Sequence, residues 1–231
     1  MFKASWFVES VPNVPAGARY CRHWDLAATK ATGRTGQAWT AGVLLAELNG
    51  EFWVVHVKRL QGDPDEVRNA ILLQAKNDGH GVIVSLPLDP GQAGVVQKRD
   101  MLRLLSGFTV RVERETGKKA DRALPLTGLC SGGLFHLVRK NDPLRDMWIQ
   151  PYVDEIVAFP GSPTKDQVDA TSGAYATLAR GFNYFNNNYH RSDLGVGVAR
   201  EEGFGDSPNE HLKGKRGQGG ARRAYRRQKN F

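Results

Sequence analysis

The chain has 231 residues and a mass of 25.5 kDa, which suits one domain with extensions and excludes a multidomain motor. Hydrophobic residues make up 40% and charged residues 24%, which excludes a disordered body, and no apolar run approaches the roughly 20 residues of a membrane span. The net charge of +8 comes entirely from eight basic residues between His211 and Phe231, so the rest is neutral and the tail is expected to bind an anionic partner.

The first half of the chain predicts an antiparallel meander. The Pro- and Gly-containing stretch at 11–17 indicates that residues 1–17 are a lead-in to a domain over residues 18–185. Strands are expected over 19–26, 38–48 and 51–60, and Asn49-Gly50 between the last two predicts a two-residue hairpin turn.

A helix and a buried strand follow the meander. Asp63, Pro64 and Glu66 are typical of a capped helix start, and Asp78-Gly79 closes that helix. Residues 82–86 form the continuous apolar run expected of a strand that is covered on both faces.

The second half predicts further helices and strands. A helix over 95–105 and a strand over 108–112 have the spacing of a crossover, which makes the strands at 82–86 and 108–112 parallel neighbours. A small strand at 134–138 and a helix over about 141–159 come next. The last helix begins near Thr164, with Gln167 at capping-box spacing, and runs to about Phe182; residues 186–231 are expected to be an irregular, basic tail. This order of elements predicts an α/β mixed sheet of about five strands flanked by helices.

Four acids stand where they can meet at one edge of this sheet. Asp25 ends the first strand, Asp89 follows the buried strand, and Asp166 and Asp169 lie three residues apart on the last helix. Clustered carboxylates repel one another unless cations lie between them, so the grouping predicts a site for Mg²⁺ or Mn²⁺. Two such ions can together activate water and stabilise the leaving oxygen of a phosphodiester.

Each acid also has a purely structural alternative. Asp89 before Pro90 is typical of a helix cap, Asp25 suits a polar strand end, and Asp166 and Asp169 suit the first turn of a helix. The six histidines form no zinc-binding pair, and Cys21 and Cys130 have neither metal-ligand nor redox spacing, so we expect reduced, buried cysteines. The N-terminus lacks the pattern of a signal peptide, which favours a protein that is not secreted.

Five motifs in order, over about residues 18–180, resemble the C-terminal nuclease domain of the large terminase subunit of tailed bacteriophages. They are Trp24-Asp25-Leu26-Ala27-Ala28-Thr29, Asp89-Pro90-Gly91-Gln92-Ala93-Gly94, Thr116-Gly117-Lys118-Lys119-Ala120-Asp121-Arg122-Ala123, Glu155 through Phe159-Pro160, and Asp166-Gln167-Val168-Asp169-Ala170. The resemblance implies a ribonuclease-H-like fold, with Asp25, Asp89 and Asp169 as catalytic acids and Asp166 as a further metal ligand. Lys165 stands where many relatives carry another acid.

The resemblance also implies an activity, partners and a location. The expected activity is that of an endodeoxyribonuclease that uses two divalent ions, Mg²⁺ or Mn²⁺, to cleave double-stranded concatemeric viral DNA during genome packaging, in the cytoplasm of the bacterial host. The expected partners are this DNA, the ATPase motor portion, the portal protein and the small terminase subunit, without a membrane. The sequence has no G-x-x-x-x-G-K-[ST] motif, so no ATP hydrolysis is expected of this chain.

Basic residues near the motifs and in the tail are candidates for contacts to DNA. Near the acids, Lys119 and Arg122 suit phosphate contacts, with an exposed, solvated position as an equal alternative. The tail candidates are Arg222, Arg223, Arg226 and Arg227. Two other functions are open: a non-catalytic DNA-binding or packaging-assembly module, and a branched-DNA resolvase of the same fold.

Overall fold

The computed structural model describes residues 1–26, 39–88, 92–114 and 117–193 of the chain. All of them lie in one compact unit, Met1–Leu194, and the second unit, Gly195–Phe231, lies outside the described residues. Within the described part, no helix combines the length and the apolar character needed to cross a membrane.

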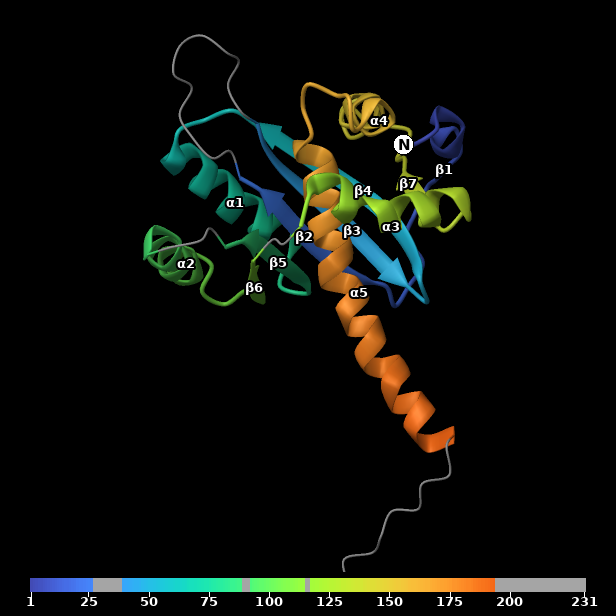
Figure 1. Cartoon of the computed structure of the whole chain (residues 1–231). Coiled ribbons are helices and arrows are strands. Elements are labelled where there is room, and N and C mark those ends of the chain that lie inside the picture. Colours follow the sequence, from blue (N-terminus) through green and yellow to red (C-terminus); the bar gives the residue numbers. More distant parts are fainter. Residues whose placement is uncertain (27–38, 89–91, 115–116, 194–231) are drawn as a thin grey trace, which may run out of the picture. The chain divides into compact units, whose positions relative to one another are not determined.

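A mixed sheet forms the centre of this unit (Figure 1). Across the sheet the strands follow the order β1-β7-β4-β3-β2-β5-β6. Their bounds are β1 (Ser10–Val11), β2 (Arg19–Asp25), β3 (Thr40–Leu48), β4 (Glu51–Leu60), β5 (Val82–Pro87), β6 (Val110–Glu113) and β7 (Phe135–Val138). The predicted mixed sheet is confirmed, including the small strand expected at 134–138, which is β7 beside β4, and in the described residues the sheet gains β1 beside β7.

The strand directions confirm the predicted meander and crossover. Strands β2, β3 and β4 pair antiparallel, and Asn49 and Gly50 at the β3–β4 turn have φ values of 53° and 86°, which a two-residue hairpin of this type requires. Strand β5 pairs parallel with both β2 and β6. Because β2 and β5 run in the same direction, Asp25 and Pro87 at their ends lie at the same edge of the sheet.

Helices cover both faces of the sheet. Their bounds are η1 (Ala4–Phe7, a 3-10 helix), α1 (Pro64–Asp78), α2 (Gln92–Leu104), α3 (Lys119–Ser131), α4 (Ile149–Ala158) and α5 (Asp166–Asp193). Helices α1 and α2 pack on one face in a core with Trp24, Val84 and Leu86. Helices α3, α4 and α5 pack on the other face in a core with Cys21, and Figure 1 shows α5 crossing the sheet.

Local sequence signals determine where α1 begins. Asp63 accepts hydrogen bonds from the backbone N–H groups of Asp65 and Glu66, and the Glu66 side chain accepts from the backbone of Asp63, which completes the predicted capping box. Ile71 and Ala75, four residues apart, are 1% and 3% exposed, so this helix packs on the sheet through one apolar face.

Several predicted boundaries are wrong. Residues 1–17 were expected to lead into the fold, but Phe2 and Phe7 lie in its core and Ser10–Val11 pairs with β7, because two large aromatic side chains gain more by burial than by exposure. The helix predicted to end near Phe182 continues to Asp193. Helix α4 begins only at Ile149, since Asp142 caps a short turn by accepting from the backbone N–H of Leu144.

Candidate metal centre

Asp25 is placed by the alternation of side chains along β2. Trp24 packs against the α1 side of the sheet, whereas His23 faces α5. Asp25, the last residue of β2, lies on the face of His23, and its Oδ2 is 3.5 Å from Lys119 Nζ of α3. The acid that ends β2 therefore faces the helices that cover this side of the sheet.

The first turn of α5 reaches this face because the helix lies very close to the sheet. A Cβ atom at Gly173 would lie 2.3 Å from the ring of His23, so no larger residue fits there. The ring of His23 contacts the Ser85 hydroxyl at 2.8 Å, and that hydroxyl lies 3.1 Å from Thr177 Oγ1 of α5. These buried contacts hold α5 against β2 and β5, and they fix the position of the helix that carries Asp166 and Asp169.

Asp169 is the most deeply buried acid of the candidate centre, with a side chain that is 0% exposed. One of its oxygens, Oδ2, forms an ion pair with Lys119, and the other, Oδ1, accepts a hydrogen bond from Arg122 Nη2 at 3.0 Å. Because the Lys119 ammonium also lies near Asp25, the carboxylates of β2 and α5 converge on one cationic group.

The charge state of Lys119 reflects this convergence. Burial lowers the pKa of Lys119. The hydrogen bond to Asp169 and the charges of Asp25, Asp169 and Asp166 raise it by a larger amount, so the net shift is upward. The carboxylates thus stabilise a positive charge between them. Carboxylate oxygens are also the donors that Mg²⁺ and Mn²⁺ prefer, so the donor set at this point fits a hard divalent cation.

Asp166 lies one helical turn before Asp169 and is partly buried. Burial raises the pKa of its carboxyl group, and the charge of Glu155 adds to this shift, while Lys119 and Arg59 oppose it. Asp166 is therefore within the electrostatic field of the candidate centre.

Two of the four predicted acids are brought together by a shared contact, Asp25 and Asp169. Asp89 lies outside the described residues, two positions after β5 ends at Pro87. Within the described residues, no group of three His, Cys, Asp or Glu side chains has a metal-binding arrangement.

Glu155 of α4 belongs to one of the five sequence motifs, but the sequence did not predict a functional role for it. It is 4% exposed, and its carboxylate accepts from the backbone N–H of Gln167 and from the Thr164 hydroxyl at 2.7 and 2.8 Å. The predicted capping box between Thr164 and Gln167 is thus replaced by donation from both residues to Glu155. Glu155 stands three residues after Tyr152 and four before Phe159, and a charged residue at this spacing on the apolar face of a helix is the sequence signal that would have pointed to this role.

Lys119 and Arg122 were predicted to contact phosphate or to be solvated at the surface. Their side chains are 45% and 21% exposed, and both contact Asp169 from the first turn of α3. They therefore border the candidate centre. The four tail arginines predicted to bind DNA, Arg222, Arg223, Arg226 and Arg227, lie outside the described residues.

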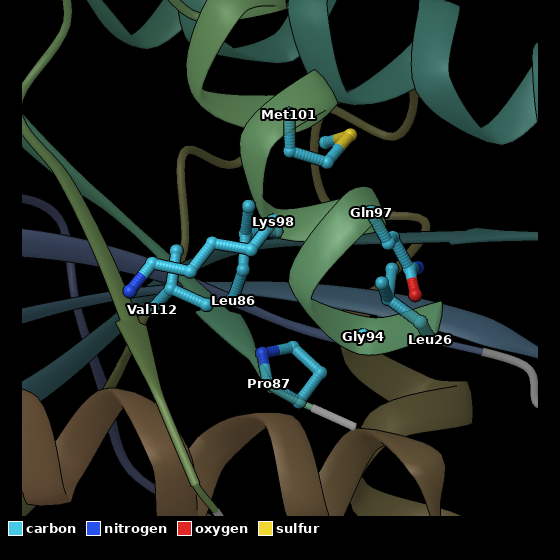
Figure 2. Close-up of a pocket in the computed structure, with 8 residues that line it drawn as sticks. All are labelled: Leu26, Leu86, Pro87, Gly94, Gln97, Lys98, Met101 and Val112. Atoms are coloured by element: carbon cyan, nitrogen blue, oxygen red, sulfur yellow. The ribbon is translucent and has the colours of Figure 1, made fainter. Parts of the chain in front are cut away.

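A small pocket lies beside α2, near the ends of β5 and β6 (Figure 2). Its lining is mainly apolar and includes Leu26, which follows Asp25, together with Leu86, Met101 and Val112. None of the acids that the structure describes lines it. The pocket therefore belongs to the packing of α2 on the sheet.

The fold and the motifs identify the family. The family model described as the terminase RNaseH-like domain matches residues 22–178, which is more than half of the chain. The chain belongs to this family. The match runs from within β2 to residue 178 of α5, so the acids of this terminase domain lie within it, and the resemblance seen in the sequence is confirmed.

Solved structures of terminase nucleases share the fold of this terminase domain. The large terminase nuclease from thermophilic phage G20c with bound zinc has 14% identity and a TM-score of 0.52, over 75% of this chain and 95% of that one. The magnesium-bound form of that nuclease has 14% identity and a TM-score of 0.51, over 75% and 94%. The human cytomegalovirus terminase nuclease domain, soaked with manganese and bound to an inhibitor, has 13% identity and a TM-score of 0.55, over 75% and 91%. A comparison with curated protein sequences gives no match.

Proposed function

We propose that this domain is a metal-dependent endonuclease that hydrolyses phosphodiester bonds of double-stranded viral DNA during genome packaging. The observation that carries the proposal is the convergence of Asp25 and Asp169, from the end of β2 and the first turn of α5, on one cationic group. Membership of the terminase RNaseH-like domain family and the metals bound by its structural neighbours support the same assignment.

Asp25, Asp89 and Asp169 are the proposed catalytic acids and metal ligands, with Asp166 as a further ligand. Two divalent ions, Mg²⁺ or Mn²⁺, when bound, lower the pKa of a water molecule and stabilise the leaving 3′ oxygen. The burial of Asp169 limits the access of water to its carboxylate, which strengthens its interaction with any cation at this point. This chain therefore supplies rigid anionic ligands on a strand and a helix.

Lys119 and Arg122 are the proposed substrate contacts nearest to the acids. Both extend from α3 to Asp169, and both are partly exposed, so each can exchange a carboxylate for a DNA phosphate at modest cost. We assign them to phosphate contacts beside the scissile bond, and we assign Arg222, Arg223, Arg226 and Arg227 to DNA farther along the duplex. The ATPase motor portion, the portal protein and the small terminase subunit are the proposed protein partners.

The decisive experiment compares Asp25→Asn and Asp169→Asn with Asp121→Asn, an exposed acid on α3 that serves as the matched control. We expect cleavage of supercoiled plasmid in Mn²⁺ to fall below about one hundredth of the wild-type rate in the first two variants and to stay unchanged in the control. Addition of EDTA should stop cleavage by the wild-type protein. Undiminished cleavage by Asp25→Asn and Asp169→Asn would overturn the proposed acids.

A binding measurement separates the nuclease from an assembly module. Replacing the four tail arginines by alanine should reduce the slope of log affinity against log salt by up to about 0.9 per lost phosphate contact. Tight, salt-sensitive binding of duplex DNA by the wild-type protein without cleavage in any divalent metal would favour the non-catalytic alternative.

A further inference from the structure

We propose that Glu155 is a positioning residue that holds the first turn of α5, and with it Asp166 and Asp169, at the candidate metal centre. The inference rests on the proposed function and extends it to a residue outside the set of metal ligands. Glu155 lies on α4, a different helix from the acids, and it is 4% exposed.

The contacts of Glu155 are concentrated at the start of α5. Its Oε1 accepts from the backbone N–H groups of Gln167 at 2.7 Å and Val168 at 3.3 Å. The first N–H groups of any helix lack partners within the helix, and here a carboxylate from another helix supplies one. Gln167 and Val168 are the two residues between Asp166 and Asp169, so Glu155 holds the backbone segment that joins the two acids.

The second oxygen of Glu155 is also surrounded by donors. Oε2 accepts from the Thr164 hydroxyl at 2.8 Å and from Gln167 Nε2 at 2.9 Å, and Gln167 Nε2 also donates to the carbonyl of Pro151 at 3.2 Å. A glutamine at position 155 would offer one acceptor oxygen and would direct its amide N–H groups at donors. The environment therefore specifies a carboxylate and not merely a residue of this shape.

Arg59 balances the charge that this arrangement buries. Its Nη2 lies 3.7 Å from Glu155 Oε2, and its guanidinium lies over the ring of Trp39 at 4.4 Å. A buried carboxylate with a nearby cation and four hydrogen bonds is well satisfied, so both oxygens of Glu155 are held in place.

This rigidity matters because both acids depend on the same short segment. If Gln167 and Val168 lose their anchor, the first turn of α5 frays, as helix ends do, and Asp166 and Asp169 lose their fixed distance from Asp25. Residues that orient metal ligands through hydrogen bonds typically contribute about tenfold or more to metal affinity.

The test measures Mn²⁺ affinity by electron paramagnetic resonance on the full chain without DNA. Glu155→Gln is expected to weaken Mn²⁺ binding by about tenfold. Thr164→Val removes one donor to Oε2 and should weaken it by about threefold. Asp154→Asn, an exposed neighbour on the same helix, is the matched control and should bind as the wild type does.

A second control separates positioning from general stability. Ile71→Val in the core under α1 removes a buried methylene, which costs stability on the opposite face of the sheet from α5. We expect this variant to unfold at a lower temperature while binding Mn²⁺ with unchanged affinity. In cleavage assays, Glu155→Gln should need about tenfold more Mn²⁺ for half-maximal rate and regain most of the wild-type rate at saturating Mn²⁺.

The outcomes distinguish this inference from the proposed function. Wild-type Mn²⁺ affinity in both Glu155→Gln and Thr164→Val, or an equal loss in Ile71→Val, would overturn the positioning role while leaving the nuclease assignment in place. A wild-type protein that neither binds Mn²⁺ nor cuts DNA would overturn the proposed function, and the positioning role with it.

Discussion

Two clusters of charged residues lie on opposite faces of β2, and they are built differently. On the α1 face, Arg22 and Asp78 form an ion pair whose side chains are 1% and 6% exposed. On the α5 face, Asp169 is 0% exposed, but its partners Lys119 and Arg122 are 45% and 21% exposed. In the first cluster both partners are buried, and we call it the sealed cluster. In the second the acid is buried while its two cations are partly exposed, and we call it the exchangeable cluster.

The difference indicates which cluster can exchange its partners. Arg22 also donates to the carbonyl of Gly42 at 2.9 Å and contacts His56 Nδ1 at 3.2 Å. Its guanidinium is therefore paired entirely with groups inside the protein. Lys119 and Arg122 can turn toward water or toward a phosphate while Asp169 stays in place. Burial of the acid combined with exposure of its cations is what we expect of a site that exchanges ligands.

The largest effect on stability is expected in the sealed cluster. Asp78→Asn leaves the buried Arg22 guanidinium without its carboxylate, which should lower the free energy of unfolding by about 3–5 kcal/mol. Urea denaturation followed by circular dichroism measures this change, with the exposed Asp154→Asn as the control. A loss below that of ordinary surface substitutions would show that Arg22 has found another partner, and the contrast between the clusters would fail.

The sequence predicted the elements of these clusters where the signals are local. The Asn49-Gly50 hairpin and the Asp63 to Glu66 capping box form as expected, because each involves residues within a few positions of one another. The end of β2 at Asp25 was also predicted closely. Local chemistry of this kind is strongly determined by the chain itself.

The sequence failed where distant contacts override local signals. Helix α3, which carries Lys119, was not predicted because Pro125 and Gly128 within it oppose a helix, whereas packing of buried side chains such as Leu126 stabilises it. The pairing of Lys119 with Asp169 depends on how two helices meet, and the role of Glu155 depends on donors from another helix. Neither arrangement leaves a periodic pattern in the sequence.

The next largest effect is expected at the close contact that places the exchangeable cluster. Gly173→Ala would bring a Cβ atom to 2.3 Å from the buried ring of His23. The alanine gains about 1 kcal/mol of helix propensity, but overpacking in a core costs about 1–3 kcal/mol and here also separates α5 from β2. We therefore expect a net loss of unfolding free energy, together with weaker Mn²⁺ binding.

Gly128→Ala on α3 is the matched control for this substitution. A Cβ atom there would meet nothing within 4 Å, so only the propensity gain remains and stability should rise by about 0.5–1 kcal/mol. Thermal unfolding of both variants checks the pair. Equal shifts in the same direction would show that the contact between Gly173 and His23 does not limit the packing of α5.

A smaller effect is expected from pH at the sealed cluster. Burial and the charge of Arg22 lower the pKa of His56 from 6.5 to about 4. Because the folded protein binds this proton less readily than the unfolded chain, the stabilisation is present above pH 6.5 and is lost as the pH falls toward 4. His56→Asn keeps an acceptor for Arg22 but cannot titrate there. The difference in unfolding free energy between wild type and variant should change by about 1 kcal/mol between pH 7 and pH 5, since solvent screens a partly exposed ring.

The smallest change in stability is expected at the exchangeable cluster. Here an Asp to Asn substitution should leave the free energy of unfolding nearly unchanged, in contrast to Asp78→Asn. Asp169→Asn removes a buried charge, but Lys119 still lies near Asp25 and Arg122 can turn to water, so neither cation is left buried and unpaired. We expect the unfolding free energy to change by less than about 1 kcal/mol while Mn²⁺ binding and DNA cleavage are lost. Denaturation in urea without metal measures the first quantity. A loss as large as that of Asp78→Asn would mean that Asp169 is a structural anchor like Asp78, and exposure of the cations would no longer separate the two clusters.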